Sequence, residues 1–312
     1  MIDYTFQYRS TVTPDELPEL TWDLFVSAYN PCDRVRNVFN LVNATRKDWI
    51  IHNEYHFASG DVPVGAFSSD SESEDEFILQ YFESCGGVDA FKTAKICIDV
   101  TGFMRPHMLF LIRYLFENGV KKFDVLYTEP GQYSERDSTK FSSDDVDLVR
   151  QVAGYEGVNN HIEENDVLIV NAGYEDRRIA EVADEKEKAR KIVIYGLPSL
   201  KADMYQQSVL RTRGAYDALG DTHRKAYAPA SDPFATATVL SKLIEEENQR
   251  KPVSNLFLAP LATKPQALGF GLYYLTEGIG KAISIIYPFS ATYQADASSG
   301  MGRIWMYSIE LE

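Results

Sequence analysis

Residues 95–127 read KICIDVTGFMRPHMLFLIRYLFENGVKKFDVLY, and this stretch decides the fold class. Ile96–Val100 is a short, continuous run of mostly apolar residues, which is typical of a strand that is buried on both faces. Pro106–Asn118 follows with the periodicity of a helix, and Phe123–Tyr127 is a second strand-like run. A strand, a helix and a strand in this order form a βαβ unit, so the sequence predicts a parallel sheet covered by helices.

The same alternation of short apolar runs and longer helical patterns continues along the chain. The strands that we expect are Trp49–Ile51, Ile96–Val100, Phe123–Tyr127, Val167–Val170, Ile192–Tyr195, Leu256–Leu258, Ile283–Tyr287 and Ile304–Tyr307. The helices that we expect are Glu74–Ser84, Pro106–Asn118, Arg177–Ala189, Lys201–Leu219, Pro233–Arg250 and Pro265–Glu277. Residues 1–45 are harder to interpret, with room for a short helix between Pro14 and Asn30. The sequence therefore predicts an α/β fold built from Rossmann-like units.

A second stretch resembles the first one. Phe110 and Tyr127 align with Phe270 and Tyr287 at one constant offset. The pairs Arg105-Pro106 and Lys264-Pro265 each place proline where a helix would begin, with the cation in the preceding turn. We therefore predict two Rossmann-like halves with largely parallel sheets related by an internal repeat, residues 1–150 and 151–312.

The composition limits the partners of the chain. Its 312 residues suit one large domain or two closely joined domains, and 45% hydrophobic residues are enough for a large core. The net charge is −15 and no run of lysines and arginines is present, which opposes binding of duplex nucleic acid but leaves an acidic surface for a basic protein partner.

Targeting signals and cysteine patterns are also absent. The three cysteines form no CxxC pair, the chain opens without a signal peptide, and no apolar stretch approaches about 18 residues. We expect a reduced cytoplasmic protein without a membrane span.

The first candidate site follows the strand Ile96–Val100. Ligands of open α/β sheets bind at the carboxyl ends of the strands, where the next helix begins and its N–H groups favour anions. Thr101 supplies a hydroxyl group, Gly102 allows close approach of the backbone, and Arg105 can bind a phosphate or carboxylate with two hydrogen bonds. The alternative is an ordinary strand-to-helix turn with a solvated arginine.

The repeat supplies a second candidate site. Thr263 and Lys264 follow the strand Leu256–Leu258 and have the same chemical rationale as Thr101 and Arg105. Two such half-sites could face one another and share one ligand.

A third cluster follows the strand Val167–Val170. Gly173 suits a tight turn, Glu175 is a candidate general base, and Asp176 lies beside it at the expected start of a helix. Ser199, after the next strand, could add a hydroxyl group. Acidic residues at a helix start also stabilise the helix, which is the alternative interpretation.

Several aromatic residues fall at or beyond the predicted strand ends, where they could stack on a base. They are Tyr127, Tyr133, Tyr287 and Tyr293. Packing in the core or at its rim is the commoner role of tyrosine.

One short segment contains metal-binding residue types. His52, Glu54 and His56 alternate, so they would share a face of an extended strand. Imidazole and carboxylate groups suit zinc or iron, but no further ligand is evident. We expect neither a metal nor a cofactor. No Walker A, GxGxxG, GxSxG or HExxH motif is present, which removes support for the common nucleotide-hydrolase, dinucleotide, α/β-hydrolase and zinc-protease classes.

The turns at Thr101–Arg105 and Thr263–Lys264 resemble the Thr-Gly-Gly-Thr-Lys-type turn of CARF domains, which are Rossmann-like sensors of cyclic oligonucleotides in bacterial immunity. The pair is also similar to SAVED domains, which look like two such units in one chain. The resemblance covers two turns and their helices. It implies an anionic nucleotide ligand near these four residues and a role in anti-phage defence.

The sequence thus favours binding or sensing of a small anionic, nucleotide-like ligand, such as a cyclic oligonucleotide, at the carboxyl edge of the sheets. Two alternatives remain. One is a metal-dependent enzyme that acts on nucleotides or nucleic-acid ends, with Glu175, Asp176 and Asp99 as its carboxylates. The other is a non-catalytic acidic scaffold that docks a partner protein.

Overall fold

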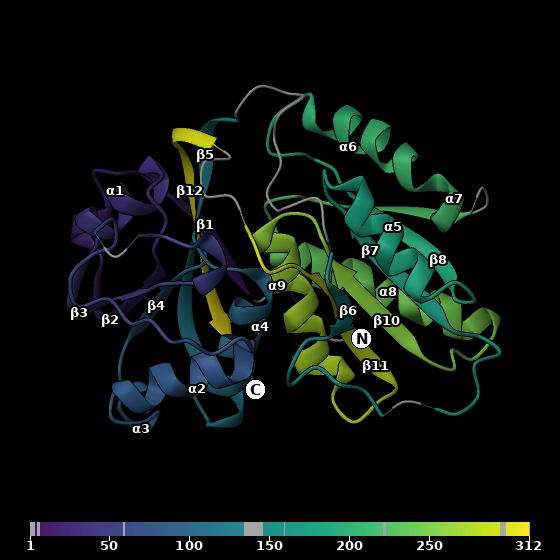
Figure 1. Cartoon of the computed structure of the whole chain (residues 1–312), viewed down its shortest axis with the longest axis horizontal. Coiled ribbons are helices and arrows are strands. Elements are labelled where there is room, and N and C mark those ends of the chain that lie inside the picture. The colour runs from purple at the N-terminus through teal and green to yellow at the C-terminus, as the bar shows by residue number, and fades with distance from the viewer. Residues whose placement is uncertain are drawn as a thin grey trace. The chain divides into compact units, whose positions relative to one another are not determined.

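The computed structural model describes Tyr4 and residues 7–58, 60–133, 146–158, 160–220, 223–293 and 298–311 (Figure 1). The chain forms two compact units. The N-terminal unit comprises residues 7–143 and 291–312, and the C-terminal unit comprises residues 1–6 and 144–290. The division differs from the predicted halves, 1–150 and 151–312, mainly because the two chain ends are exchanged between the units.

The N-terminal unit contains a sheet of six strands in the order β1-β12-β5-β4-β2-β3. The bounds are β1 (Tyr8–Val12), β2 (Thr21–Ala28), β3 (Asn43–Ile50), β4 (Ile96–Asp99), β5 (Lys122–Tyr133) and β12 (Ser298–Glu310). Strands β3, β2, β4 and β5 are parallel, β12 runs antiparallel to β5, and β1 runs antiparallel to β12. The long pair of β5 and β12 is visible in Figure 1.

Four helices connect the parallel strands of this unit. Helix α1 (Asp33–Leu41) joins β2 to β3, helices α2 (Glu74–Ser84) and α3 (Asp89–Lys92) lie between β3 and β4, and α4 (Arg105–Glu117) joins β4 to β5. Right-handed crossovers place α1 on one face of the sheet and α2 and α4 on the other. Helix α2 packs against α4.

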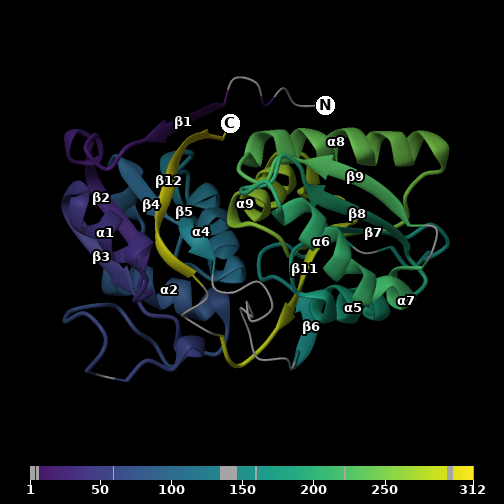
Figure 2. The same ribbon diagram turned by 90° about the horizontal axis from the view of Figure 1, so that it is seen from above.

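The C-terminal unit contains a second six-stranded sheet in the order β6-β11-β10-β7-β8-β9. All neighbours are parallel except β6, which runs antiparallel to β11. The strand bounds are β6 (Leu148–Gln151), β7 (Val167–Ala172), β8 (Arg190–Gly196), β9 (Arg224–Ala228), β10 (Leu256–Pro260) and β11 (Ile283–Phe289). The helix bounds are α5 (Asp176–Glu185), α6 (Met204–Thr212), α7 (Tyr216–Leu219), α8 (Pro233–Arg250) and α9 (Lys264–Tyr273). Figure 2 shows α8 on one face of this sheet and α5 and α7 on the other.

The two units share one plan, which confirms the predicted α/β fold with two Rossmann-like halves. The segments β4-α4-β5 and β10-α9-β11 occupy equivalent places, since β4 lies beside β2 and β10 lies beside β7. In each sheet the strand that begins the parallel series lies between two later parallel strands, β2 between β3 and β4 and β7 between β8 and β10. This is the topological switch point where such sheets bind ligands. Strands β4, β7 and β10 are buried along their whole length because helices cover both faces.

Most predicted elements are present, and the differences have physical reasons. The short helix expected between Pro14 and Asn30 is only a 3-10 turn, Leu17–Glu19, because Thr21–Ala28 is an inner strand rich in β-branched and aromatic residues. The expected helix Lys201–Leu219 is split into α6 and α7 by a 3-10 turn. Strands β1, β6 and β9 at the sheet edges were not expected. In the described part of the chain, none of the helices has both the length and the apolar character needed to cross a bilayer.

Candidate functional site

The carboxyl edge of the N-terminal unit is held together by buried polar side chains. The carboxylate of Asp99, at the end of β4, accepts hydrogen bonds from Ser27 Oγ and from the Thr101 amide, both at 3.0 Å. The Thr101 hydroxyl oxygen accepts a 2.9 Å hydrogen bond from the amide of Thr128. Asp99 and Thr101 are buried, so these two predicted site residues tie the ends of β2, β4 and β5 together.

The two predicted glycines lie at equivalent close contacts. A Cβ atom on Gly102 would lie 1.9 Å from the carbonyl oxygen of Ala28, and one on Gly173 would lie 2.5 Å from that of Leu261. Each glycine is therefore required where the two strands beside a switch point meet. The close approach that we expected toward a ligand is, in both units, an approach to the neighbouring backbone.

The two predicted cations each begin a helix. Arg105 is the first residue of α4 and Lys264 the first residue of α9, so Met104 and Thr263, rather than the cations, are the N-cap residues. Thr263 Oγ1 accepts a hydrogen bond from the Gln266 amide and donates one to the carbonyl oxygen of Ala230. The hydroxyl group of Thr263 therefore caps the start of α9.

Sequence reasoning missed a second arginine at the N-terminal edge. Arg34 is the second residue of α1, and its guanidinium donates a 3.1 Å hydrogen bond to the carbonyl oxygen of Thr128. Burial raises the pKa of Tyr55 to about 12, and the positive charges of Arg34 and Arg105 act against this rise. The same two arginines oppose the burial that raises the pKa of Tyr127. Both cations therefore act against the rise in pKa of these two tyrosines.

Tyr55 belongs to a group of half-buried aromatic side chains. Tyr29 follows β2, Trp49 lies near the end of β3, and Tyr55 and Phe57 follow β3. The ring of Tyr29 lies 5.5 Å from that of Trp49 and 5.4 Å from that of Phe57, which in turn lies 5.4 Å from Tyr55. We call these four residues the aromatic group. The missed strand β2 explains why Tyr29 was not expected.

The predicted stacking tyrosines are placed differently. Tyr127 and Tyr287 are buried in the cores of their units. Tyr293 is half-buried, and the side chain of Tyr133 lies outside the described residues.

At the carboxyl edge of the C-terminal unit, the buried side chain of Arg178 binds the polar groups around it. Arg178 donates hydrogen bonds to Tyr287 Oη at 3.3 Å and to Ser290 Oγ at 2.7 Å. Its Nε atom lies 3.6 Å from the carboxylate of Glu175, the candidate general base. Glu175 thus has a structural partner in this buried network.

The remaining predicted residues are divided between the units. Asp176 begins α5, and the Ser199 hydroxyl donates to the carbonyl oxygen of Lys201 within its own turn. Glu175 and Asp176 belong to the C-terminal unit and Asp99 to the N-terminal unit.

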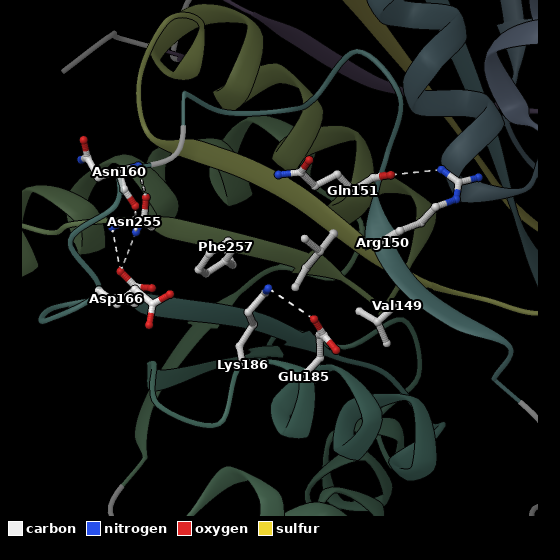
Figure 3. Close-up of a pocket in the computed structure, with 11 residues that line it drawn as sticks. Val149, Arg150, Gln151, Asn160, Asp166, Glu185, Lys186, Asn255 and Phe257 are labelled. Atoms are coloured by element: carbon white, nitrogen blue, oxygen red, sulfur yellow. Dashed lines mark hydrogen bonds and ion pairs between the residues drawn. The ribbon is translucent and has the colours of Figure 1, made fainter.

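The C-terminal unit has a polar cavity of about 370 Å³ at the amino ends of β7 and β10 (Figure 3). Its polar groups largely satisfy one another. Asn255 Nδ2 donates to Asp166 Oδ1 at 2.9 Å, and Lys186 Nζ lies 3.5 Å from Glu185 Oε1 and 4.6 Å from the centre of the Phe257 ring. This cavity lies at the edge of the sheet opposite to the predicted one.

The structure changes the set of residues that could hold a metal. His52, Glu54 and His107 each offer one donor atom, and these atoms all lie within 4.8 Å of one another. His107 comes from the first turn of α4, far from His52 in the sequence. The expected third residue, His56, is exposed, with a left-handed backbone (φ 48°), and does not belong to this set.

Comparisons of the chain with models of protein families, with curated proteins and with solved structures found no match.

Proposed function

We propose that the chain binds a small anionic, nucleotide-like ligand at the carboxyl edge of the N-terminal unit. The observation that carries the proposal is the position of two helix starts beside the switch point between β2 and β4. Arg34 of α1 donates a hydrogen bond to the carbonyl oxygen of Thr128, and the amide of Thr128 donates one to Thr101 in the turn that leads to Arg105 of α4. Cations would bind the phosphate groups, and the aromatic group would contact the base.

The local chemistry favours an anion. Arg34 and Arg105 occupy the first turns of α1 and α4, where backbone N–H groups and the helix dipole also attract negative charge. The N-cap residues, Cys32 and Met104, make no side-chain capping hydrogen bond. Two guanidinium groups on neighbouring helix starts suit a phosphate, because each can donate two parallel hydrogen bonds.

The aromatic group supplies the second half of the argument. Its rings are neither fully buried nor fully exposed, so a base could cover them and remove apolar surface from water. Stacking of a base on an aromatic side chain contributes about 1–3 kcal/mol and tolerates different bases. Cyclic oligonucleotides are the first ligands to test, since the CARF-type turns point to them. Lys264 begins α9 at the equivalent edge of the C-terminal unit, and we propose this edge as a second binding site for the same class of ligand.

The enzyme alternative has less support. Of its three carboxylates, Glu175 faces the buried Arg178, and Asp99 accepts hydrogen bonds from Ser27 and Thr101. Neither group has the arrangement of a general base that faces a substrate.

The proposal is tested by calorimetric titration and thermal shift with mono-, di- and cyclic nucleotides. A ligand that binds only the folded chain stabilises it by about 2.7 kcal/mol at a hundred times Kd. Arg34→Ala and Arg105→Ala should each weaken binding by about 10- to 100-fold, because a hydrogen bond to a charged group contributes about 1.5–3 kcal/mol. Tyr55→Leu should weaken it while keeping an apolar side chain.

Arg36→Ala is the matched control, because Arg36 lies on α1 as well but is exposed. It should bind like the unchanged chain. A flat response to all nucleotides would refute the proposal. Binding that is lost in Lys264→Ala but kept in Arg34→Ala and Arg105→Ala would move the site to the C-terminal unit.

A further inference from the structure

Three metal-ligating side chains of the N-terminal unit lie together without a role in the proposed ligand site. His52 follows β3, Glu54 lies on the 3-10 turn Asn53–Tyr55, and His107 lies on the first turn of α4. Their donor atoms lie within 4.8 Å of one another. Two imidazoles and one carboxylate are a common protein ligand set for zinc and for non-haem iron.

The two imidazoles lie close together in a buried, apolar environment. The His52 side chain is fully buried and His107 is 5% exposed. The rings lie 4.5 Å apart, and Phe77 packs against both of them, with ring centres 5.6 Å from His52 and 5.1 Å from His107. Apolar packing therefore holds the two rings next to one another.

One hydrogen bond identifies which nitrogen of His52 carries a lone pair. The Met104 amide donates to His52 Nε2 at 3.3 Å, and a backbone N–H can only donate. Nε2 is therefore unprotonated, as a metal ligand must be.

The distance between His107 and Glu54 suits a shared ion better than a direct bond. Nε2 of His107 lies 3.9 Å from Oε1 of Glu54, which is too long for a hydrogen bond. Two donors bound to one zinc ion at about 2.1 Å lie roughly 3.4 Å apart at a tetrahedral angle. Glu54 has 22% of its side chain exposed and can make the small adjustment that the buried histidines cannot.

We propose that His52, Glu54 and His107 bind a divalent transition-metal ion of the Zn²⁺ or Fe²⁺ class. Three protein ligands leave at least one coordination position for water or for a bound molecule. The inference goes beyond the proposed ligand site and does not depend on it. It also revises the expectation from the sequence, where His56 stood in the place that His107 takes in the fold.

The test is metal analysis of the full chain, produced with a purification tag that contains no histidine. Metal content is measured by mass spectrometry as isolated, and again after chelation and reloading with Zn²⁺, or with Fe²⁺ under anaerobic conditions. We expect close to one ion per chain, and the element retained distinguishes zinc from iron. Competition with a coloured chelator then gives the affinity.

Glu54→Gln and His107→Ala should each lower metal affinity at least about tenfold, since even the loss of a residue that only hydrogen-bonds to a metal ligand costs about 10- to 100-fold. His56→Ala is the matched control and should keep the affinity of the unchanged chain. Glu54→Gln preserves the size of a half-exposed side chain, so it tests the site even where His107→Ala fails to fold. Visible absorption of bound Co²⁺ reports directly on coordination and should weaken in Glu54→Gln.

Two results would overturn the inference. One is an unchanged chain that takes up no Zn²⁺, Fe²⁺ or Co²⁺ after reloading. The other is a bound ion whose affinity falls in His56→Ala but is unaffected by Glu54→Gln. Loss of nucleotide binding with intact metal binding would refute only the proposed function.

Discussion

Replacing Gly102 by alanine should destabilise the N-terminal unit strongly. The new Cβ atom would lie 1.9 Å from the carbonyl oxygen of Ala28 and 2.9 Å from its carbonyl carbon. Carbon and oxygen atoms that are not bonded approach to about 3.2 Å at the closest, so the overlap is roughly 1.3 Å. Both of these atoms belong to the backbone of Ala28, so neither can turn away as the end of a flexible side chain would. Ala28 is also the buried last residue of β2. The turn after β4 or the end of β2 must move.

The expected cost is about 3 kcal/mol, at the upper end of the range of about 1–3 kcal/mol for overpacked sites. For a unit of this size, each kcal/mol lowers the melting temperature by about 2–4 °C, which gives a fall of about 6–12 °C. Tryptophan fluorescence is the appropriate probe. All three tryptophans, Trp22, Trp49 and Trp305, belong to the N-terminal unit.

Gly60→Ala is the matched control, since no atom lies within 4 Å of its added Cβ. It should change the free energy of unfolding by less than about 0.5 kcal/mol. A Gly102→Ala chain that unfolds within 0.5 kcal/mol of the unchanged protein would show that the ends of β2 and β4 are not packed as described.

Two further substitutions test the C-terminal unit by far-UV circular dichroism. Glu247 is buried and contacts three arginines, Arg190 at 2.6 Å, Arg224 at 2.7 Å and Arg250 at 3.3 Å. Burial acts to raise the pKa of Glu247, but the hydrogen bonds from Arg224 and Arg190 outweigh it and hold that pKa below its usual value. The ionised group therefore stabilises the fold above the unfolded pKa of about 4.3, and this contribution is lost as the pH falls through the folded pKa. Glu247→Gln should lower the free energy of unfolding by about 2 kcal/mol at pH 7, which is less than for a fully buried pair because the arginines are partly exposed. It should also make the free energy of unfolding depend less on pH in the acid range. An unchanged pH dependence would contradict this prediction. Gly269→Ala should lower the free energy of unfolding by about 1–3 kcal/mol, since the new Cβ would lie 2.4 Å from the carbonyl oxygen of Pro233, where α8 packs on α9. An unchanged free energy of unfolding would show that α8 and α9 pack less closely than described.

The sequence by itself determined the repeated βαβ units. Ile96–Val100 and Leu256–Leu258 are apolar runs that only a doubly covered strand can bury, and each is followed by a proline that marks a helix start. These signals are local, since they depend on residues that are neighbours along the chain. They placed Arg105 and Lys264 in the turns before the helices, one residue short of their positions as the first residues of α4 and α9.

The tertiary structure alone decided which distant residues meet. Nothing local in 298–310 shows that this strand pairs with β5 of the first sheet, because pairing partners depend on long-range contacts and not on propensity. The same holds for the candidate sites. Arg34 reaches the carbonyl oxygen of Thr128 on β5 only because Thr21–Ala28 is an inner strand, and His107 joins His52 and Glu54 only because α4 begins beside the segment that follows β3. A spacing of residues along the chain predicts a shared face of one element, whereas a site built from three elements is set by how the sheet orders its strands.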